Sequence, residues 1–296
     1  MYLKNNWRDI DPAENKGKGK TMKSKYIFLD IDGTLVGYDS KIPESAMKAL
    51  SLAKANGHKI IIASGRAYCM IYPELLRAVD FDGVISSGGA CVMVDGQVIY
   101  ESYIEDENLK FVIDYFRANG ITYLLMSKDD IYAEPVFNEY VLPGMIKAGY
   151  NKALVEQAYG TNIEVKDIRE VKGGNKLAYF TSPFKPEKIA SDLDGRFYVV
   201  DFSVGKTEEA NFFGEMNNGG VNKASGIDEY LKHVGGSIED TIAIGDSAND
   251  LEMLEHAAVA VAMGNGTDAA KSAADFVTTD VDKDGIYNAF LKLGLI

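Results

Sequence analysis

Three short polar clusters of this chain each directly follow an apolar run, and together they contain four aspartates. The clusters are Asp30-Ile31-Asp32-Gly33-Thr34, Ser64-Gly65-Arg66 and Gly245-Asp246-Ser247-Ala248-Asn249-Asp250. If the four carboxylates meet, they repel one another unless a bound cation balances their charge. Oxygen ligands without histidine or cysteine favour Mg2+ over softer metal ions.

Groups suited to phosphate oxygens accompany these carboxylates. They are the Ser64 hydroxyl, a lysine, and the loop N–H groups around Gly33 and Gly65. Mg2+ held by few carboxylates usually keeps waters and binds a substrate phosphate oxygen. Since aspartate can act as a covalent nucleophile through an aspartyl-phosphate, the combination predicts phosphoryl transfer.

The elements that must position these clusters are short apolar strands that alternate with helices. The strands are expected at 25–29, 58–63, 82–86, 241–245, 259–263 and 276–278, and the helices at 44–56, 66–77, 222–233, 249–257, 267–274 and 285–293. This alternation predicts an α/β fold with a doubly wound parallel, Rossmann-like sheet. Ligands of such sheets bind beyond the carboxyl ends of the strands, so the three clusters are expected to meet at one edge.

The middle of the chain has a different pattern, which predicts an inserted domain. Residues 102–214 are expected to form an α+β cap with antiparallel pairing, inserted into a catalytic core of residues 22–101 and 215–296. Just before the insertion, Asp95-Gly96 between two apolar runs predicts a β-hairpin. Residues 1–21 show no apolar period and are expected to be an appended tail or a disordered arm.

Four motifs in order resemble those of the haloacid dehalogenase-like superfamily. They are Phe28-Leu29-Asp30-Ile31-Asp32-Gly33-Thr34-Leu35, Ser64-Gly65-Arg66, Lys223 in Val221-Asn222-Lys223, and Gly245-Asp246-Ser247-Ala248-Asn249-Asp250. The insertion is similar to the type IIB cap of Cof-type phosphatases, and Ala262-Met263-Gly264-Asn265 and Asp284-Gly285 also match the Cof pattern. The resemblance covers about residues 23–296.

The resemblance implies roles for individual residues. Asp30 is expected to be the nucleophile that attacks phosphorus. Asp32 is expected to protonate the leaving oxygen and then to activate water, while its backbone carbonyl binds Mg2+. Asp246 is expected to be the other direct Mg2+ ligand, with Asp250 in support directly or through water. Ser64 and Lys223 are expected to hold the phosphoryl oxygens.

Some of these side chains also have a purely structural interpretation. Ser64 could cap the helix that follows it, and Lys223 taken alone could be a solvated helix lysine. Asn249 either orients the phosphate or Lys223, or only caps a helix. Arg66 either contacts substrate or is a surface helix residue. Gly88 stands where Cof-type chains commonly have asparagine, in Gly88-Gly89-Ala90, which puts selectivity for the leaving group in doubt.

Composition excludes several other classes of protein. Lys plus Arg number 31 against 44 Asp plus Glu, and the formal charge of −13 argues against binding to nucleic acid or to an anionic membrane. The apolar runs are shorter than the ~20 residues of a membrane helix, and no signal peptide is visible. Two cysteines, Cys69 and Cys91, suggest a reducing compartment, so a cytoplasmic location is expected.

The sequence therefore predicts a Mg2+-dependent phosphatase that hydrolyses a phosphomonoester through an aspartyl-phosphate. A small phosphorylated metabolite is the expected substrate, because a cap over the site leaves little room for a protein. Among such metabolites, sugar phosphates are the first expected substrates, and pyridoxal phosphate or a flavin-pathway phosphate is the next. Two alternatives stay open: a phosphomutase or other phosphotransferase that uses the same Asp30, and a non-catalytic sensor of a phosphate ligand.

Overall fold

The computed structural model describes residues 23–37, 41–201 and 212–296. The tail expected at residues 1–21 lies outside these described residues. The chain divides into two compact units. Unit 1 comprises Met1–Ile62, Arg77–Asp82 and Val234–Ile296, and unit 2 comprises Ala63–Leu76 and Gly83–His233. Each unit is described by itself below.

Unit 1 is built on a parallel sheet, as the alternating pattern predicted. Its strands lie in the order β14 (Phe276–Val277), β13 (Val259–Ala262), β12 (Thr241–Gly245), β1 (Tyr26–Leu29) and β2 (Lys59–Ala63), and every neighbouring pair is parallel. All residues of β12 and β13 are buried, which explains why these strands are continuous apolar runs rather than alternating ones. The short β14 forms the edge of the sheet.

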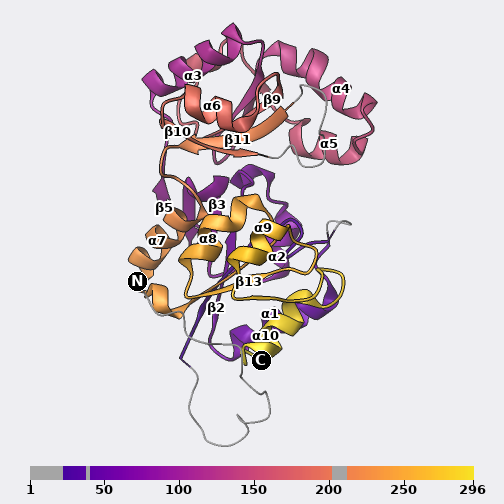
Figure 1. The fold of residues 1–296 in the computed structure, drawn as a ribbon, viewed down its shortest axis with the longest axis vertical. Helices are drawn as coiled ribbons and strands as arrows, with labels where there is room; N and C mark the ends of the chain where they lie inside the picture. The colour runs from indigo at the N-terminus through magenta and orange to yellow at the C-terminus, as the bar shows by residue number, and fades with distance from the viewer. Residues whose placement is uncertain (1–22, 38–40, 202–211) are drawn as a thin grey trace, which may run out of the picture. The chain divides into compact units, whose positions relative to one another are not determined.

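The helices of unit 1 show that the sheet is doubly wound. From β1 the chain passes through α1 (Glu44–Ala55) to β2, whereas from β12 it passes through α8 (Leu251–His256) to β13 and through α9 (Asp268–Ala273) to β14. These two paths leave the β1/β12 pair in opposite directions, so right-handed crossovers put α1 on one face and α8 and α9 on the other. The last helix, α10 (Gly285–Lys292), packs beside α1 (Figure 1). The order of the strands therefore switches between β1 and β12, where ligands of such sheets bind.

Unit 2 contains an antiparallel ribbon of β3 (Gly83–Ser86), β4 (Cys91–Val94) and β5 (Gln97–Glu101). Asp95 and Gly96 connect β4 to β5 with φ angles of 49° and 72°. Both values are left-handed, as a two-residue hairpin turn requires. The predicted hairpin is confirmed.

Unit 2 also contains a mixed six-stranded sheet, which is the predicted α+β insertion. Its strand order is β10 (Phe197–Asp201), β11 (Phe212–Asn218), β9 (Lys176–Ser182), β6 (Thr122–Met126), β7 (Ile131–Ala133) and β8 (Ile163–Glu164). Neighbouring strands are antiparallel except for β7 and β8, which are parallel.

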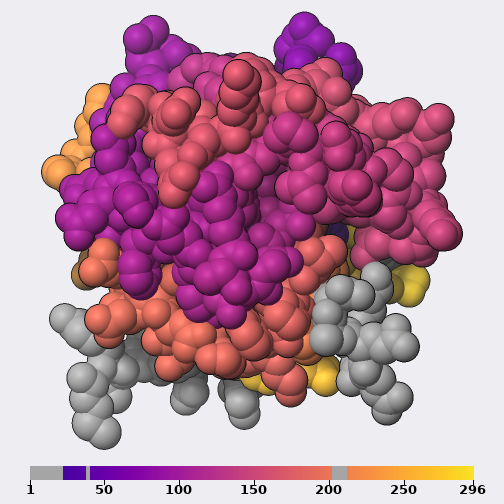
Figure 2. Space-filling model, turned by 90° about the horizontal axis from the view of Figure 1, so that it is seen from above, coloured from indigo at the N-terminus to yellow at the C-terminus, as the bar shows by residue number. Residues whose placement is uncertain are grey.

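Apolar clusters cover both faces of this six-stranded sheet. One cluster joins Leu177 and Tyr179 to side chains of α3 (Asp106–Ala118) and α6 (Pro186–Asp192). The other joins Ala178 and Phe180 to Phe137 of the π-helix η4 (Phe137–Val141). The side chains of α4 (Leu142–Lys147) and α5 (Lys152–Tyr159) form a lobe at the right of the face seen in Figure 2.

The single helix predicted over 66–77 is wrong. The structure has a 3-10 turn, η2 (Tyr68–Met70), followed by a separate helix α2 (Pro73–Ala78). Proline disfavours helical geometry in the residue before it, so Pro73 begins a helix but cannot continue one. The remaining elements are α7 (Lys223–Val234) and the 3-10 turns η3 (Ser87–Gly89), η5 (Ile168–Glu170), η6 (Ile238–Asp240) and η7 (Ala248–Asp250).

We searched the described ranges, 23–37, 41–201 and 212–296, for a helix with the length and apolar character of a membrane span, and none has both.

Candidate active site

Asp30 and Asp246 stand at the same edge of the unit 1 sheet because their strands are parallel neighbours. Asp30 follows β1 and Asp246 follows β12, with Leu29 opposite Ile244 in the register. The backbone N–H of Asp30 donates to the carbonyl of Ile244 over 3.1 Å. Asp30 is buried, with 3% of its surface exposed.

The loop after β1 closes on itself. The N–H of Leu35 donates to the carbonyl of Asp30 over 3.2 Å, and the N–H of Gly33 donates to the carbonyl of Val36 over 3.0 Å. Gly33 has a φ of 84°, a left-handed conformation that glycine adopts readily. The exposed Asp32 stands within this closed turn, two residues beyond Asp30.

Two residues to which the sequence analysis gave no role hold this loop against Asp246. The Thr34 hydroxyl donates to Oδ1 of Asp246 over 3.3 Å. The Asn265 amide donates to the carbonyl of Gly33 over 2.8 Å and accepts from the N–H of Val281 over 2.8 Å. Both residues lie inside the motifs quoted above, and this place in a motif is the sequence signal that could have identified them. Their function depends on contacts between distant segments, which the sequence does not show.

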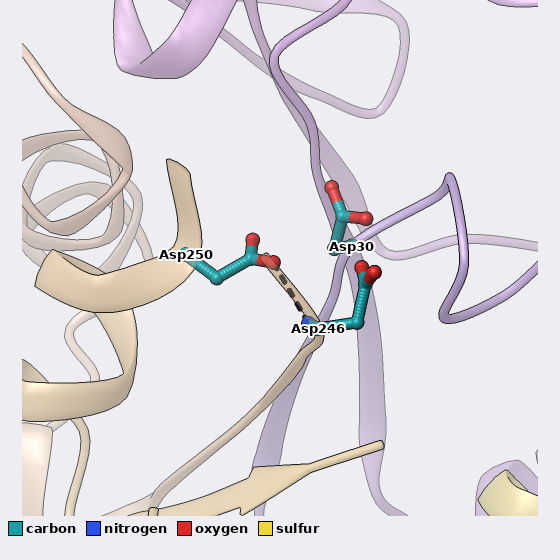
Figure 3. A group of neighbouring side chains, drawn as sticks. All are labelled: Asp30, Asp246 and Asp250. Atoms are coloured by element: carbon teal, nitrogen blue, oxygen red, sulfur yellow. Dashed lines mark hydrogen bonds between the residues drawn. The ribbon is translucent and has the colours of Figure 1, made fainter. Parts of the chain in front are cut away.

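Asp250 shapes the loop that carries Asp246. It is fully buried, and its Oδ2 accepts from the N–H of Asp246 over 2.9 Å (Figure 3). The same oxygen also accepts from the N–H of Ser247 over 2.9 Å. The Ser247 hydroxyl donates to Oδ1 of Asn249 over 2.9 Å. Ser247 is the N-cap residue of η7, and Asn249 lies within that turn, so the interpretation of Asn249 as the cap is wrong.

Three of the four predicted carboxylates come together in a group that could hold a metal ion. Asp30, Asp246 and Asp250 each offer one oxygen, and these oxygens all lie within 4.8 Å of one another. Figure 3 shows the carboxylates of Asp30 and Asp246 side by side at the ends of their strands. The group contains only aspartates, and a set of carboxylate oxygens fits a hard divalent cation such as Mg2+.

Ser64 and Arg66 belong to unit 2, in the loop after β2. Ser64 is buried, its N–H donates to the carbonyl of Ile85 over 2.8 Å, and its hydroxyl accepts from the N–H of Arg66 over 3.2 Å. The first helical residue after this loop is Tyr68 of η2, whose N-cap residue is Ala67, so the interpretation of Ser64 as a helix cap and of Arg66 as a helix residue is wrong. The Arg66 guanidinium instead lies 4.6 Å from the centre of the Tyr72 ring.

Lys223, the first residue of α7, is 2% exposed, so the interpretation as a solvated lysine is wrong. The start of α7 comes very close to the turn that contains Gly88 and Gly89. A Cβ on Gly89 would lie 2.0 Å from the carbonyl oxygen of Asn222, so only glycine fits there. A Cβ on Gly88 would lie 3.1 Å from Oδ1 of Asn217.

The sequence gives no indication of an ion pair in unit 2 that contains a buried lysine. Lys176, the first residue of β9, is 1% exposed, and its ammonium group pairs with Glu215 of β11 and donates to the carbonyl of Gly65. Burial lowers the pKa of the Lys176 ammonium, whereas the Glu215 carboxylate raises it. Neither residue belongs to a motif, and an isolated lysine in a strand gives no signal in a sequence.

The sequence and the fold match those of known proteins. A family model described as haloacid dehalogenase-like hydrolase matches residues 27–290. The chain is 31% identical over 277 residues to "Putative phosphatase YkrA" of Bacillus subtilis (strain 168), which covers 93% of this chain and 100% of that protein. It is 28% identical over 282 residues to 5-amino-6-(5-phospho-D-ribitylamino)uracil phosphatase YitU of the same organism, with coverages of 91% and 97%.

A solved structure agrees with these relatives. The HAD subclass IIB sugar phosphatase BT4131 superposes with a TM-score of 0.76 at 31% identity, over 92% of this chain and 100% of that one. The chain belongs to the haloacid dehalogenase-like hydrolase family. Within that family it is a Cof-like phosphatase of subclass IIB, a phosphoric monoester hydrolase.

Proposed function

We propose that this phosphatase depends on Mg2+ and hydrolyses its substrate through an aspartyl-phosphate formed on Asp30. The observation that carries the proposal is the group of Asp30, Asp246 and Asp250 at the point where the strand order switches. In this proposal Asp30, Asp246, Asp250 and the backbone carbonyl of Asp32 hold the cation. When bound, Mg2+ offsets the negative charge that develops on the phosphoryl group.

The two aspartates of the first motif divide the chemistry between them. An oxygen of Asp30 bonds to phosphorus while the bond from phosphorus to the leaving oxygen breaks, and Asp32 gives that oxygen a proton. Asp32 then takes a proton from a water molecule, which attacks the phosphorus and releases Asp30. The exposure of Asp32 supports this role, because the group must exchange protons with both substrate and water.

Further residues of the motifs bind the phosphoryl oxygens in this proposal. Ser64 and Lys223 are the main ligands, because a hydroxyl and an ammonium group can each donate to phosphoryl oxygens, and both residues are buried. The N–H groups of Gly33 and Gly65 add donors, and Asn249 orients the turn beside Asp246 through Ser247. Arg66 and the backbone at Gly88 contact the leaving group.

We propose a sugar phosphate as the substrate, whose leaving group is recognised by a cap of residues 102–214 inserted into a core of residues 22–101 and 215–296. Two similar proteins support a polyhydroxylated leaving group, since one is a sugar phosphatase and the other acts on a 5-phospho-D-ribityl compound. Exchanging residues 102–214 for those of a relative tests this proposed division of the chain into a catalytic core and a cap that determines specificity. Specificity should move to that of the relative, whereas hydrolysis of p-nitrophenyl phosphate should persist; loss of both activities in a folded chimera would contradict it.

The test of function is release of inorganic phosphate with Mg2+ from a panel that includes hexose phosphates, pentose phosphates and pyridoxal phosphate. We expect release from sugar phosphates, and we expect the Asp30→Asn variant to release none while it keeps its fold. Transfer of the phosphoryl group to a second hydroxyl without free phosphate would establish a phosphotransferase instead. Binding without turnover of any ester would favour a sensor.

We also propose that the protein is located in the cytoplasm. Both cysteines of the chain, Cys69 and Cys91, are free. Free thiols are typical of reducing compartments. The location can be tested by fractionating cells that express the full chain.

A further inference from the structure

One buried lysine of unit 2 contacts the loop that carries Ser64, although it belongs to a distant segment. The ammonium group of Lys176 donates to the carbonyl oxygen of Gly65, a residue 111 positions away in the chain. The same ammonium pairs with Glu215, whose side chain is 23% exposed while that of Lys176 is 2% exposed. A charged group is seldom buried to this extent unless its partners fix it in one position.

The position of this pair on the six-stranded sheet is determined by the alternation of side chains. Lys176 shares a face of β9 with Ala178 and Phe180, which belong to the apolar cluster that also contains Ala67 of the Ser64 loop. The sheet and this loop are therefore in contact both through the ammonium group and through this apolar cluster. The ion pair is the polar part of that contact.

The neighbouring strand β11 makes a similar contact between the sheet and a second loop. Asn217 lies two residues beyond Glu215 on β11, so the two side chains share a face. Its buried amide donates to the carbonyl of Ser87 over 2.7 Å and to that of Asn175 over 3.2 Å. The same sheet face thus holds backbone carbonyls of two loops, one after β2 and one after β3.

The charges around Lys176 connect it to the proposed phosphate site. Lys223 of α7 is close enough for its charge to lower the pKa of the Lys176 ammonium further, whereas Glu215 raises that pKa. Burial raises the pKa of Tyr159, and the nearby Glu215 carboxylate raises it further, whereas the charge of Arg66 opposes this rise. An anion bound by Lys223 would therefore also be attracted by the Lys176 charge.

We propose that Lys176 and Glu215 are a positioning pair, which fixes the Ser64–Arg66 loop to the six-stranded sheet in the geometry that binds the phosphoryl group. The inference rests on the proposed function, since it assumes that Ser64 and Lys223 hold that group. Lys176 acts through Gly65 and through its charge, and it takes no part in bond making. Glu215 keeps the ammonium protonated and directed at the Gly65 carbonyl.

The test measures binding of inorganic phosphate by calorimetry in the presence of Mg2+, which requires no turnover. In Lys176→Met we expect phosphate affinity to fall about tenfold or more, the size of a lost charge-assisted hydrogen bond. The control is Lys188→Met, which removes an exposed lysine paired with Asp192 on α6 of the same unit. This control should bind phosphate as the wild type does.

A double variant separates positioning from stability. Lys176→Met alone leaves Glu215 without its partner, whereas Lys176→Met with Glu215→Leu removes both charges and should raise the thermal midpoint above that of the single variant. We expect phosphate affinity to stay low in the double variant although stability recovers. Recovery of affinity together with stability would show a merely structural role and would overturn the inference.

Glu215→Gln supplies a readout that depends on pH. Loss of the carboxylate removes the group that raises the pKa of Lys176, so the ammonium loses its proton at a lower pH. The decline of phosphate affinity on the alkaline side should therefore begin at a lower pH than in the wild type. An unchanged pH profile overturns the inference. Failure of the wild-type protein to bind phosphate or to hydrolyse any ester would instead refute the proposed function itself.

Discussion

A Cβ atom on Gly33 would lie 2.5 Å from Oδ2 of Asp246, a distance that real Cβ atoms essentially never show. The loop after β1 therefore contacts the carboxylate at the end of β12 with no room for a side chain. Thr34, the next residue, donates its hydroxyl to the other oxygen of the same carboxylate over 3.3 Å. Gly33 and Thr34 together set the direction in which Asp246 points.

We predict that Gly33→Ala weakens Mg2+ binding by displacing Asp246, in addition to destabilising the fold. The left-handed φ of 84° alone costs an alanine roughly 1–2 kcal/mol. Gly57→Ala is the matched control, because Gly57 has a φ of 88° in the same unit but nothing lies within 4 Å of the added Cβ. Calorimetry should show weaker Mg2+ binding only for Gly33→Ala, whereas both variants should unfold more easily. Equal Mg2+ affinities in the two variants would contradict the prediction.

Removal of the metal ion should abolish activity reversibly. EDTA should stop phosphate release and added Mg2+ should restore it, because the group of three carboxylates is the proposed cation site. Asp246→Asn should raise the Mg2+ concentration for half-maximal activity about tenfold or more, since it removes one charged ligand. Asp129→Asn, which changes an exposed aspartate of unit 2, serves as the control. Full activity in EDTA would exclude the metal from the mechanism.

We predict that the free energy of unfolding decreases at acidic pH because His58 binds a proton more tightly in the unfolded chain than in the folded one. This side chain is 2% exposed, and its Nδ1 accepts from the backbone N–H of Lys25 over 3.1 Å, which requires an unprotonated nitrogen. Burial lowers the pKa of His58 in the folded state, and the charge of Lys25 lowers it further. The unfolded chain therefore binds the proton more tightly, so this contribution is complete above a pH of about 6.5 and decreases below it.

The corresponding measurement is the free energy of unfolding of the wild type and of His58→Gln at about pH 8 and about pH 5.5. The wild type should lose more stability than the variant between these two conditions, since the variant has no group that titrates there. Parallel losses in the two proteins would show that His58 is not responsible. Other acidic groups titrate alike in both proteins, so the comparison isolates the histidine.

The parallel sheet and the aspartate group could be predicted because each depends on a local pattern. Buried strands such as Thr241–Gly245 are continuous apolar runs, and polar residues directly after them fall at one edge of the sheet. The helix predicted over 66–77 is wrong because Pro73 divides that segment.

The contacts that hold the site together could not be predicted in the same way. Asn265 and Gly33 are separated by 232 positions, and Lys176 and Gly65 by 111. Such pairs form only when strands and loops from distant segments have packed, and a single asparagine or lysine has no periodic signature before that. The sequence therefore predicted roles for residues such as Asp30 and Asp246, but none for the residues that position them.

The most direct test of the mechanism is to trap the covalent intermediate during turnover. The protein is mixed with p-nitrophenyl phosphate and Mg2+, quenched in acid and reduced with borohydride, which converts an aspartyl-phosphate to homoserine. Peptide mass spectrometry should then find homoserine at position 30 of the wild-type chain and an unchanged aspartate at position 32. Homoserine at another position, or none while phosphate is being released, would contradict the assignment of Asp30 as the nucleophile.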